Sequence, residues 1–338
     1  MVEPDPLRHH GDVEARGADL DFAVNVYDGP RPPWLDAALL ASLDDVGAYP
    51  SASLARAAVA RLHEIGEDEV LVTAGAAEAF TLVARLREWR RPVVVHPQFT
   101  EPHAALEQAG HAVTPVVLSA PFALAAGDVP EDADLVVVGN PTNPTGALHP
   151  AAVLRSLLRP GRLVVVDEAF MDCVPGEPDA LVAVRLPGLV VIRSLTKHWG
   201  IPGVRAGYVT GDPAVVAGLE RGQTPWSIGT TAAAAVVACT SPAAVVEGRR
   251  RAEEIATWRA HLSQGLSTLG IPFQHSAASF VLAQVGAGVR EELRASGIAV
   301  RRADTFPGLD DTWVRIAVRP PARTDVLLAA LGSLLPVH

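Results

Sequence analysis

Short apolar runs alternate with helical stretches over most of the first two thirds of the chain. Three runs, at 135–138, 163–166 and 189–193, are apolar almost throughout and have the length of a strand. Such runs bury both faces, as strands do in a parallel sheet that helices cover on both sides. The same alternation predicts further strands at 70–74, 92–96, 113–118 and 207–210 and helices at 76–88, 100–109 and 213–221. The pattern indicates an α/β fold with a mainly parallel central sheet.

The pattern changes after about residue 242, where a long helical stretch begins at Pro242 and runs to about residue 269. Strands predicted at 280–284, 298–301 and 313–318 then interleave with helices at 290–296 and 323–335. Fewer helices per strand favour a smaller α+β domain, and 338 residues are enough for two domains. We therefore expect an N-terminal arm at 1–30 that packs against the small domain or a partner subunit, a large domain at 31–245 and a small domain at 246–338.

Charge and cysteine usage exclude several classes of partner. The net charge is −10 at pH 7, whereas binders of nucleic acid or of membrane surfaces are usually basic. No apolar run reaches 18 residues, and the first 20 residues are polar, so we expect neither a membrane span nor a signal peptide. Two cysteines, Cys173 and Cys239, make neither a disulfide framework nor a zinc site. We expect a cytoplasmic protein without a bound metal.

The basic residues are distributed unusually, since 27 of the 28 are arginine and one, Lys197, is lysine. A guanidinium stays protonated and forms no imine, so arginine cannot replace lysine as an amine nucleophile. Drift in composition that spared one surface lysine would give the same count. Lys197, however, comes just after the apolar run at 189–193, where open α/β sheets bind ligands. We therefore take Lys197 as the candidate catalytic amine.

Other polar groups follow the remaining runs. Asp167 comes directly after 163–166, the Asn-Pro-Thr-Asn-Pro-Thr-Gly segment at 140–146 follows another run, and Ser194 and Arg205 flank Lys197. A helix begins after Gly75 and offers free N–H groups to a phosphate. Taken singly, these features also fit a helix cap, a turn and an ordinary strand-to-helix connection. Together they supply the amine, the carboxylate and the phosphate-binding groups that pyridoxal phosphate (PLP) requires.

Three of these segments, 140–146, 167–170 and 194–208, carry a family resemblance in their order along the chain. The sequence resembles fold-type I PLP enzymes of the class I and II aminotransferase superfamily. Within that superfamily it is similar to the branch that holds histidinol-phosphate aminotransferases and L-threonine-O-3-phosphate decarboxylases of cobalamin biosynthesis. The similarity extends from about residue 49 to residue 319. It implies the three-layer PLP-transferase fold with a smaller α+β C-terminal domain.

The resemblance also implies how the cofactor is held. Lys197 would bind PLP as a Schiff base and transfer protons once substrate displaces it. Asp167 would pair with the pyridine nitrogen, and Asn143 would donate to the ring hydroxyl. The cofactor phosphate would be bound by the N–H groups of Gly75, Ala76 and Ala77 and by the side chains of Ser194 and Arg205.

Further residues are implied for the ring face, the partner subunit and the substrate. Phe99 would stack on the cofactor ring. Tyr49 would reach the phosphate of the partner subunit's cofactor, so the active unit would be a homodimer. Arg315 would bind an anionic group of a small phosphorylated substrate, with Arg319 as a second candidate. Asn25 belongs to the N-terminal arm, which helps to form the substrate pocket in these enzymes.

Some positions depart from the aminotransferase pattern. Phe170 stands where those enzymes usually carry a tyrosine, and the loss of that hydrogen bond to the ring oxygen should raise the pKa of the imine. Phe99 in place of tyrosine and the segment at 224–227 are likewise closer to the decarboxylases. One of the arginines at 249–251 offers a further contact for a substrate phosphate.

Three functions are therefore compared. The first is a PLP-dependent decarboxylase of L-threonine O-3-phosphate that gives (R)-1-amino-2-propanol O-phosphate. The alternative is an aminotransferase acting on histidinol phosphate with 2-oxoglutarate. A noncatalytic regulatory protein of the same fold is the third, and the complete set of cofactor residues argues against it.

Overall fold

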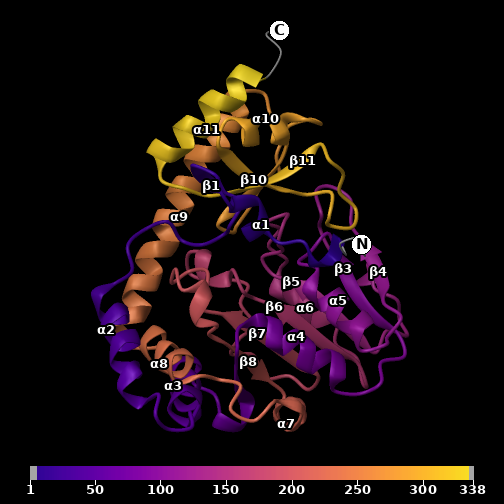
Figure 1. The fold of residues 1–338 in the computed structure, drawn as a ribbon. Coiled ribbons are helices and arrows are strands. Elements are labelled where there is room, and N and C mark those ends of the chain that lie inside the picture. Colours follow the sequence, from indigo (N-terminus) through magenta and orange to yellow (C-terminus); the bar gives the residue numbers. More distant parts are fainter. Residues whose placement is uncertain (1–5, 335–338) are drawn as a thin grey trace, which may run out of the picture.

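A computed structural model describes residues 6–334, which form two sheets of unequal size (Figure 1). The large sheet has the strand order β2-β8-β7-β6-β5-β3-β4. β8 is antiparallel to both of its neighbours, and the other pairs are parallel. The mainly parallel α/β fold predicted from the apolar runs is therefore confirmed. The strands are β2 (Val70–Thr73), β3 (Pro92–His96), β4 (Thr114–Val117), β5 (Leu135–Gly139), β6 (Leu163–Asp167), β7 (Leu189–Ser194) and β8 (Gly207–Gly211).

The central strands are buried on both faces. Successive side chains of a strand point to opposite sides, so Val136 and Val138 of β5 join one hydrophobic cluster, and Leu135 and Val137 join another. The first face is covered by α2 (Pro33–Ala41), α3 (Ser53–His63), α6 (Ala151–Ser156) and α8 (Thr230–Cys239). The second is covered by α4 (Ala76–Arg85), α5 (Glu101–Gln108) and α7 (Pro213–Gly222). The three layers thus follow from strands that are apolar at every position.

The small sheet has the order β1-β10-β11-β9 and a core of its own. Its elements are β1 (Leu20–Phe22), β9 (Phe280–Gln284), α10 (Val289–Ala295), β10 (Ile298–Arg302), β11 (Trp313–Ala317) and α11 (Pro321–Leu334). α9 (Pro242–Thr268) connects the two parts, because Ala244 packs in the core of the large sheet and Ile255 and Leu262 in that of the small one. We retain the proposed division at residues 245 and 246, within this helix. Residue 335 of the predicted last helix lies outside the described residues, as do 336–338 of the predicted small domain.

The N-terminal arm contacts both parts of the molecule. β1 pairs in parallel with β10, and Glu14 of α1 (Gly11–Ala15) forms an ion pair with Arg290 at 3.0 Å. On the other side, Thr100 Oγ1 donates a hydrogen bond of 2.6 Å to the carbonyl of Leu7. The arm therefore lies across the junction of the two sheets, as Figure 1 shows for β1 and α1. Residues 1–5 of the predicted arm lie outside the described residues.

A helix that crosses a bilayer must be both long and apolar. Between residues 6 and 334 no single helix is both long and apolar enough to cross a bilayer. The pair α8 and α9 meets those two criteria together, with a bend of 75° at the break between them.

Candidate active site

The carboxyl ends of three parallel strands bring the predicted cofactor residues together. Asp167 ends β6, Ser194 ends β7, and Asn143 lies in the loop after β5. The register pairs Gly139 with Asp167 and Asp167 with Ile192, so these strands end side by side. Lys197 follows Ser194 by three residues and therefore lies at the same edge of the sheet, where the fold class binds its ligands.

Lys197 is enclosed by the site. Burial lowers the pKa of its ammonium group to about 8, and the nearby guanidinium groups of Arg315 and Arg205 act in the same direction. A lysine with its usual pKa would be almost fully protonated at neutral pH. The lowered pKa leaves about a tenth of the amine neutral at pH 7, and the neutral amine is the nucleophilic form.

Asp167 carries a buried carboxyl group. Burial raises its pKa to about 7, although its Oδ1 accepts a hydrogen bond of 3.1 Å from the Ala169 N–H. No arginine, lysine or histidine of residues 6–334 forms an ion pair with it at 4.0 Å or less. Because an unpaired buried charge is costly, this site suits a cationic group such as a protonated pyridine nitrogen.

The turn before α4 and the Arg205 side chain form a small anion-binding cradle. Gly75 has a φ of +75°, and a Cβ atom there would lie 2.7 Å from a terminal nitrogen of Arg205. The N–H groups of Ala76 and Ala77 open the helix that follows, where the helix dipole favours an anion. Ser194 Oγ is buried and lies 2.8 Å from Thr196 Oγ1. These donors fit the phosphate group that the resemblance implies.

The substrate side of the site is built around Arg315 of β11. Its guanidinium donates to Asn143 Oδ1 at 2.7 Å and to the Ala23 carbonyl at 2.5 Å. The Asn25 side chain lies 3.1 Å from two guanidinium nitrogens and accepts from both when its amide oxygen faces them. Burial lowers the pKa of Arg315, and the nearby Arg301 lowers it further. The predicted residues Arg315, Asn25 and Asn143 are therefore brought together.

Arg301 belongs to the same site and was missed in the sequence. It lies on β10 directly opposite Arg315 in the antiparallel register, and only 2% of it is exposed. Its donors reach Thr305 Oγ1 at 2.7 Å and the His9 carbonyl at 2.8 Å. Burial lowers its pKa to about 10. No carboxylate in the described part of the chain forms an ion pair with Arg301 or Arg315, so two buried cations lie next to each other without a counterion.

Two other arginines that were predicted to contact the substrate donate hydrogen bonds to backbone carbonyl groups. Arg319 donates to the carbonyl groups of Asp21 at 2.8 Å and Val24 at 2.7 Å and so fixes the N-terminal arm. Arg251, from the arginines at 249–251, is buried and donates to the His198 carbonyl at 2.8 Å. Arg301 also donates to the carbonyl groups of His9 and Arg302, but it alone of the three lies directly opposite Arg315 in the strand register, so we take it as the candidate for the second substrate cation.

The aromatic residues of the predicted site have different surroundings. Phe170 packs edge-on against Phe280 at 5.0 Å between ring centroids. Phe99 lies 5.7 Å from the His10 ring in the arm. Tyr49 is 79% exposed and stacks on Trp226, so it has no place in the site of its own chain. The cofactor roles of Phe99, Phe170 and Tyr49 stay predictions.

A buried polar cluster behind Lys197 was also absent from the sequence-based predictions. Cys173 Sγ lies 3.8 Å from both Asp172 Oδ1 and His198 Nδ1. The other ring nitrogen of His198 lies 3.2 Å from the Gly248 carbonyl oxygen on α9. These contacts tie the segment that carries Lys197 to the helix that connects the two sheets.

Comparison with known proteins agrees with this geometry. The family model described as aminotransferase class I and II matches residues 18–331. A histidinol-phosphate aminotransferase of Mycobacterium tuberculosis is 46% identical over 331 residues, which cover 96% of this chain and 90% of that protein. The threonine-phosphate decarboxylase of Salmonella typhimurium is 30% identical, with 94% and 91% covered.

A solved structure supports the fold. The histidinol-phosphate aminotransferase of Clostridium acetobutylicum superposes with a TM-score of 0.85 at 23% identity and covers 93% of this chain and 98% of that one. The histidinol-phosphate aminotransferase from Sinorhizobium meliloti, solved in complex with pyridoxal 5'-phosphate, has a TM-score of 0.83. The chain therefore belongs to the class I and II aminotransferases, a family of enzymes that depend on PLP.

Proposed function

We propose that this enzyme is an aminotransferase that moves the amine of histidinol phosphate, or of a closely similar phosphorylated amine, to 2-oxoglutarate. The observation that carries the proposal is a pair of buried guanidinium groups: Arg315 acts on the amine of Lys197, and Arg301 lies directly opposite Arg315 on the neighbouring strand. Arg301 suits the phosphate of histidinol phosphate, and Arg315 suits a carboxylate of 2-oxoglutarate. The 46% identity to a histidinol-phosphate aminotransferase supports this alternative over the decarboxylase, which the sequence alone placed first.

The residues of the site have distinct tasks in such a reaction. When bound, PLP supplies an electron sink for the carbon that carries the substrate amine. Lys197 Nζ, whose lowered pKa leaves part of it neutral, takes the proton from that carbon. Asp167 holds a proton on the ring nitrogen, and Arg315 orients the substrate with Asn25 and Asn143 beside it.

The threonine-phosphate decarboxylase remains a second candidate because of Phe170. Its ring packs against Phe280 and offers no hydroxyl group at the position where the aminotransferases usually carry tyrosine. The identity of 30% to the Salmonella decarboxylase over 94% of the chain supports the same candidate. A carboxylate on Arg315 and a phosphate on Arg301 would suit phosphothreonine as well.

The two reactions release different products, which decides between them. The purified holoenzyme is incubated with histidinol phosphate plus 2-oxoglutarate in one tube and with phosphothreonine in another. Glutamate formation in the first tube supports the aminotransferase. Carbon dioxide release in the second, with no glutamate in the first, would replace it with the decarboxylase. Inactivity in both tubes would reject both substrates.

Replacing Arg301 with leucine should weaken binding of the phosphorylated substrate. Loss of a buried charge-assisted contact costs on the order of 2–3 kcal/mol, so KM for the phosphorylated substrate should rise roughly 30- to 150-fold. Steady-state kinetics should show a much smaller change in KM for 2-oxoglutarate, because Arg315 remains in place. Arg302→Leu is the matched control, since Arg302 is the next residue of β10 and pairs with Asp304 instead. Equal effects of the two variants would remove Arg301 from the substrate site.

We further propose that the enzyme is a homodimer whose interface includes Tyr49. Among residues 6–334, eight of the eleven large hydrophobic side chains that are exposed lie on or beside α2, α3, α8 and α9, helices that contact one another through α8. A monomer rarely exposes such a patch, and a second copy of the chain can cover it with the same patch. The eight are Leu40, Leu43, Val46, Tyr49, Leu54, Trp226, Val237 and Val246.

Leu54→Asp should turn the dimer into a monomer. Leu54 is 75% exposed in the single chain, so the substitution costs little in its fold, whereas a charge buried in an apolar interface is strongly unfavourable. Size-exclusion chromatography with light scattering should report a halved mass, and activity should fall because Tyr49 no longer reaches a partner. Val326→Asp on α11, at a side chain 48% exposed outside the patch, should change neither mass nor activity. A dimer that survives Leu54→Asp would place the interface elsewhere.

A further inference from the structure

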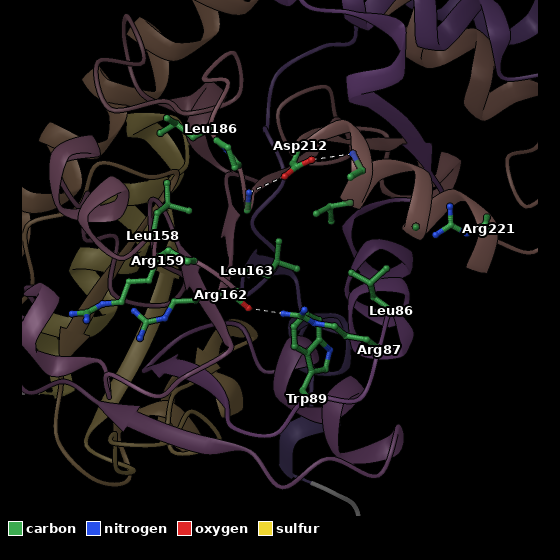
Figure 2. Close-up of a pocket in the computed structure, with 17 residues that line it drawn as sticks. Leu86, Arg87, Trp89, Leu158, Arg159, Arg162, Leu163, Leu186, Asp212 and Arg221 are labelled. Atoms are coloured by element: carbon green, nitrogen blue, oxygen red, sulfur yellow. Dashed lines mark hydrogen bonds between the residues drawn. The ribbon is translucent and has the colours of Figure 1, made fainter.

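A surface hollow of about 800 Å³ lies at the edge of the large sheet opposite to the active site. Its walls are the segment that follows α4, the segment that leads into β6, the turn before β7 and one side of α7 (Figure 2). Leu163 at its base is the first residue of β6, the strand whose last residue is Asp167. The hollow is therefore separated from the cofactor site by the length of a strand.

The floor of the hollow is apolar. Leu86, Leu158, Leu186 and Val215 come from four separate segments, are each half-buried, and line the hollow together with the buried Leu163. Figure 2 shows Leu86, Leu158 and Leu186 on different sides of Leu163. Side chains that converge in this way leave apolar surface in contact with water. An apolar group placed on them would gain roughly 25 cal/mol for each Å² removed from water.

The rim carries two arginines without an acidic partner. Arg87 and Arg221 line the hollow, and neither forms an ion pair with a carboxylate within the described range 6–334. Arg162 also lines the hollow, but it is buried and its donors are used by backbone carbonyl groups. Arg87 is held in place, since it donates to the Gly161 carbonyl at 2.9 Å and lies 4.2 Å over the Trp89 ring. A cation stacked in this way remains charged and keeps donors free.

The acid that lines the hollow does not cancel these charges. Asp212 caps α7, and its two oxygens accept from the N–H groups of Gly188 and Ala214 at 2.9 Å each. Figure 2 shows both bonds at one end of the hollow, away from Arg87. In a chain whose net charge is −10, a hollow with unpaired guanidinium groups is a local exception that favours an anion.

We propose that this hollow binds a small organic anion with an apolar body, such as an aromatic carboxylate or sulfonate. The apolar body lies on the four half-buried side chains, and the anionic group faces Arg87 and Arg221. A free inorganic anion would leave the apolar side chains exposed to water, and a neutral apolar molecule would leave the arginines without a counterion. The hollow is distinct from the PLP site, so this proposal does not depend on the proposed reaction.

The test uses 1-anilinonaphthalene-8-sulfonate, an apolar sulfonate whose fluorescence rises on transfer from water to an apolar site. Titrated into the holoenzyme, it should saturate at one molecule per chain. The double variant Arg87→Ala/Arg221→Ala should weaken binding at least tenfold, and Val215→Trp, which fills the floor, should abolish it. Arg85→Ala is the matched control, because Arg85 lies two residues before Arg87 on the exposed face of α4 and outside the hollow. Activity with the preferred substrate should be unchanged in all variants.

A neutral probe separates the charge from the apolar surface. N-phenyl-1-naphthylamine has the same ring system without the sulfonate, so it should bind more weakly and be insensitive to the arginine substitutions. Several outcomes would overturn the proposal: no saturable binding, equal affinity in the double variant, or displacement of the probe by substrate. Probe binding that is lost in Leu54→Asp but kept in Val215→Trp would assign it to the dimer surface instead.

Discussion

Lys197→Ala should abolish turnover while the protein still folds. Lys197 is the only lysine of the chain, and its amine is both enclosed and lowered in pKa to about 8. Alanine removes the cofactor's covalent partner and the group that moves the proton, so the rate should fall by at least about 10⁴-fold. Steady-state assays with the preferred substrate measure the loss. Circular dichroism and thermal melting should resemble those of the unsubstituted protein.

Lys197→Arg is the informative companion variant. It keeps a positive charge of similar reach but cannot form an imine, so it should be as inactive as the alanine variant. Borohydride reduction of the unsubstituted holoenzyme, followed by peptide mapping, should attach the cofactor to the peptide that contains Lys197. Full activity of either variant would show that another group performs the role assigned to Lys197. A label on another residue would show that the cofactor binds elsewhere.

The central strands of the large sheet could be predicted from the sequence, because they follow from a local pattern of apolar residues. β5, β6 and β7 are valine-rich and buried at every position, so their continuous apolar runs indicated strands of a parallel sheet. Asp167 was found because it directly follows such a run, and Lys197 because it is the one lysine and comes four residues after another run. Parallel strands bring their carboxyl ends to one edge. Position after a strand thus brought these two residues together, whereas the roles of the other cofactor residues were implied by the family resemblance and stay predictions.

The substrate side depends on pairings that no local pattern encodes. Arg301 was missed because its place beside Arg315 follows from the register of β10 on β11, which is set by tertiary packing. Arg319 was singled out by its closeness in sequence to Arg315, but its donors are turned to the carbonyls of the arm. α8 escaped notice because its alanine-rich sequence, apolar nearly throughout, has no polar stripe. Both reactions require the same cofactor groups, and sequence alone placed the decarboxylase first, whereas the comparisons support the aminotransferase better.

Asp167→Asn should lower activity and at the same time stabilise the cofactor-free protein at alkaline pH. Without its carboxylate the site holds the ring nitrogen's proton less well, and kcat should fall on the order of 10²-fold or more. The effect on stability has the opposite sign. Burial raises the pKa of Asp167 from 3.8 to about 7, so the folded protein binds this proton more tightly than the unfolded chain does. Its unfolding free energy therefore falls as pH rises from about 4 to about 7, by up to on the order of 4 kcal/mol.

Urea unfolding of the cofactor-free proteins at pH 5 and pH 8 measures this difference. The asparagine variant has no proton to lose, so its advantage over the unsubstituted protein should be larger at pH 8 than at pH 5. Asp172→Asn is the matched control, because burial also raises the pKa of Asp172, to about 8, at a residue of the polar cluster behind Lys197. It should gain stability with the same dependence on pH and keep its activity. Asp167→Asn could instead lose activity without any gain in stability. The Asp167 carboxylate would then already have a partner in the cofactor-free protein. In that case Asp167 would not be the unpaired buried charge that suits a cationic ring.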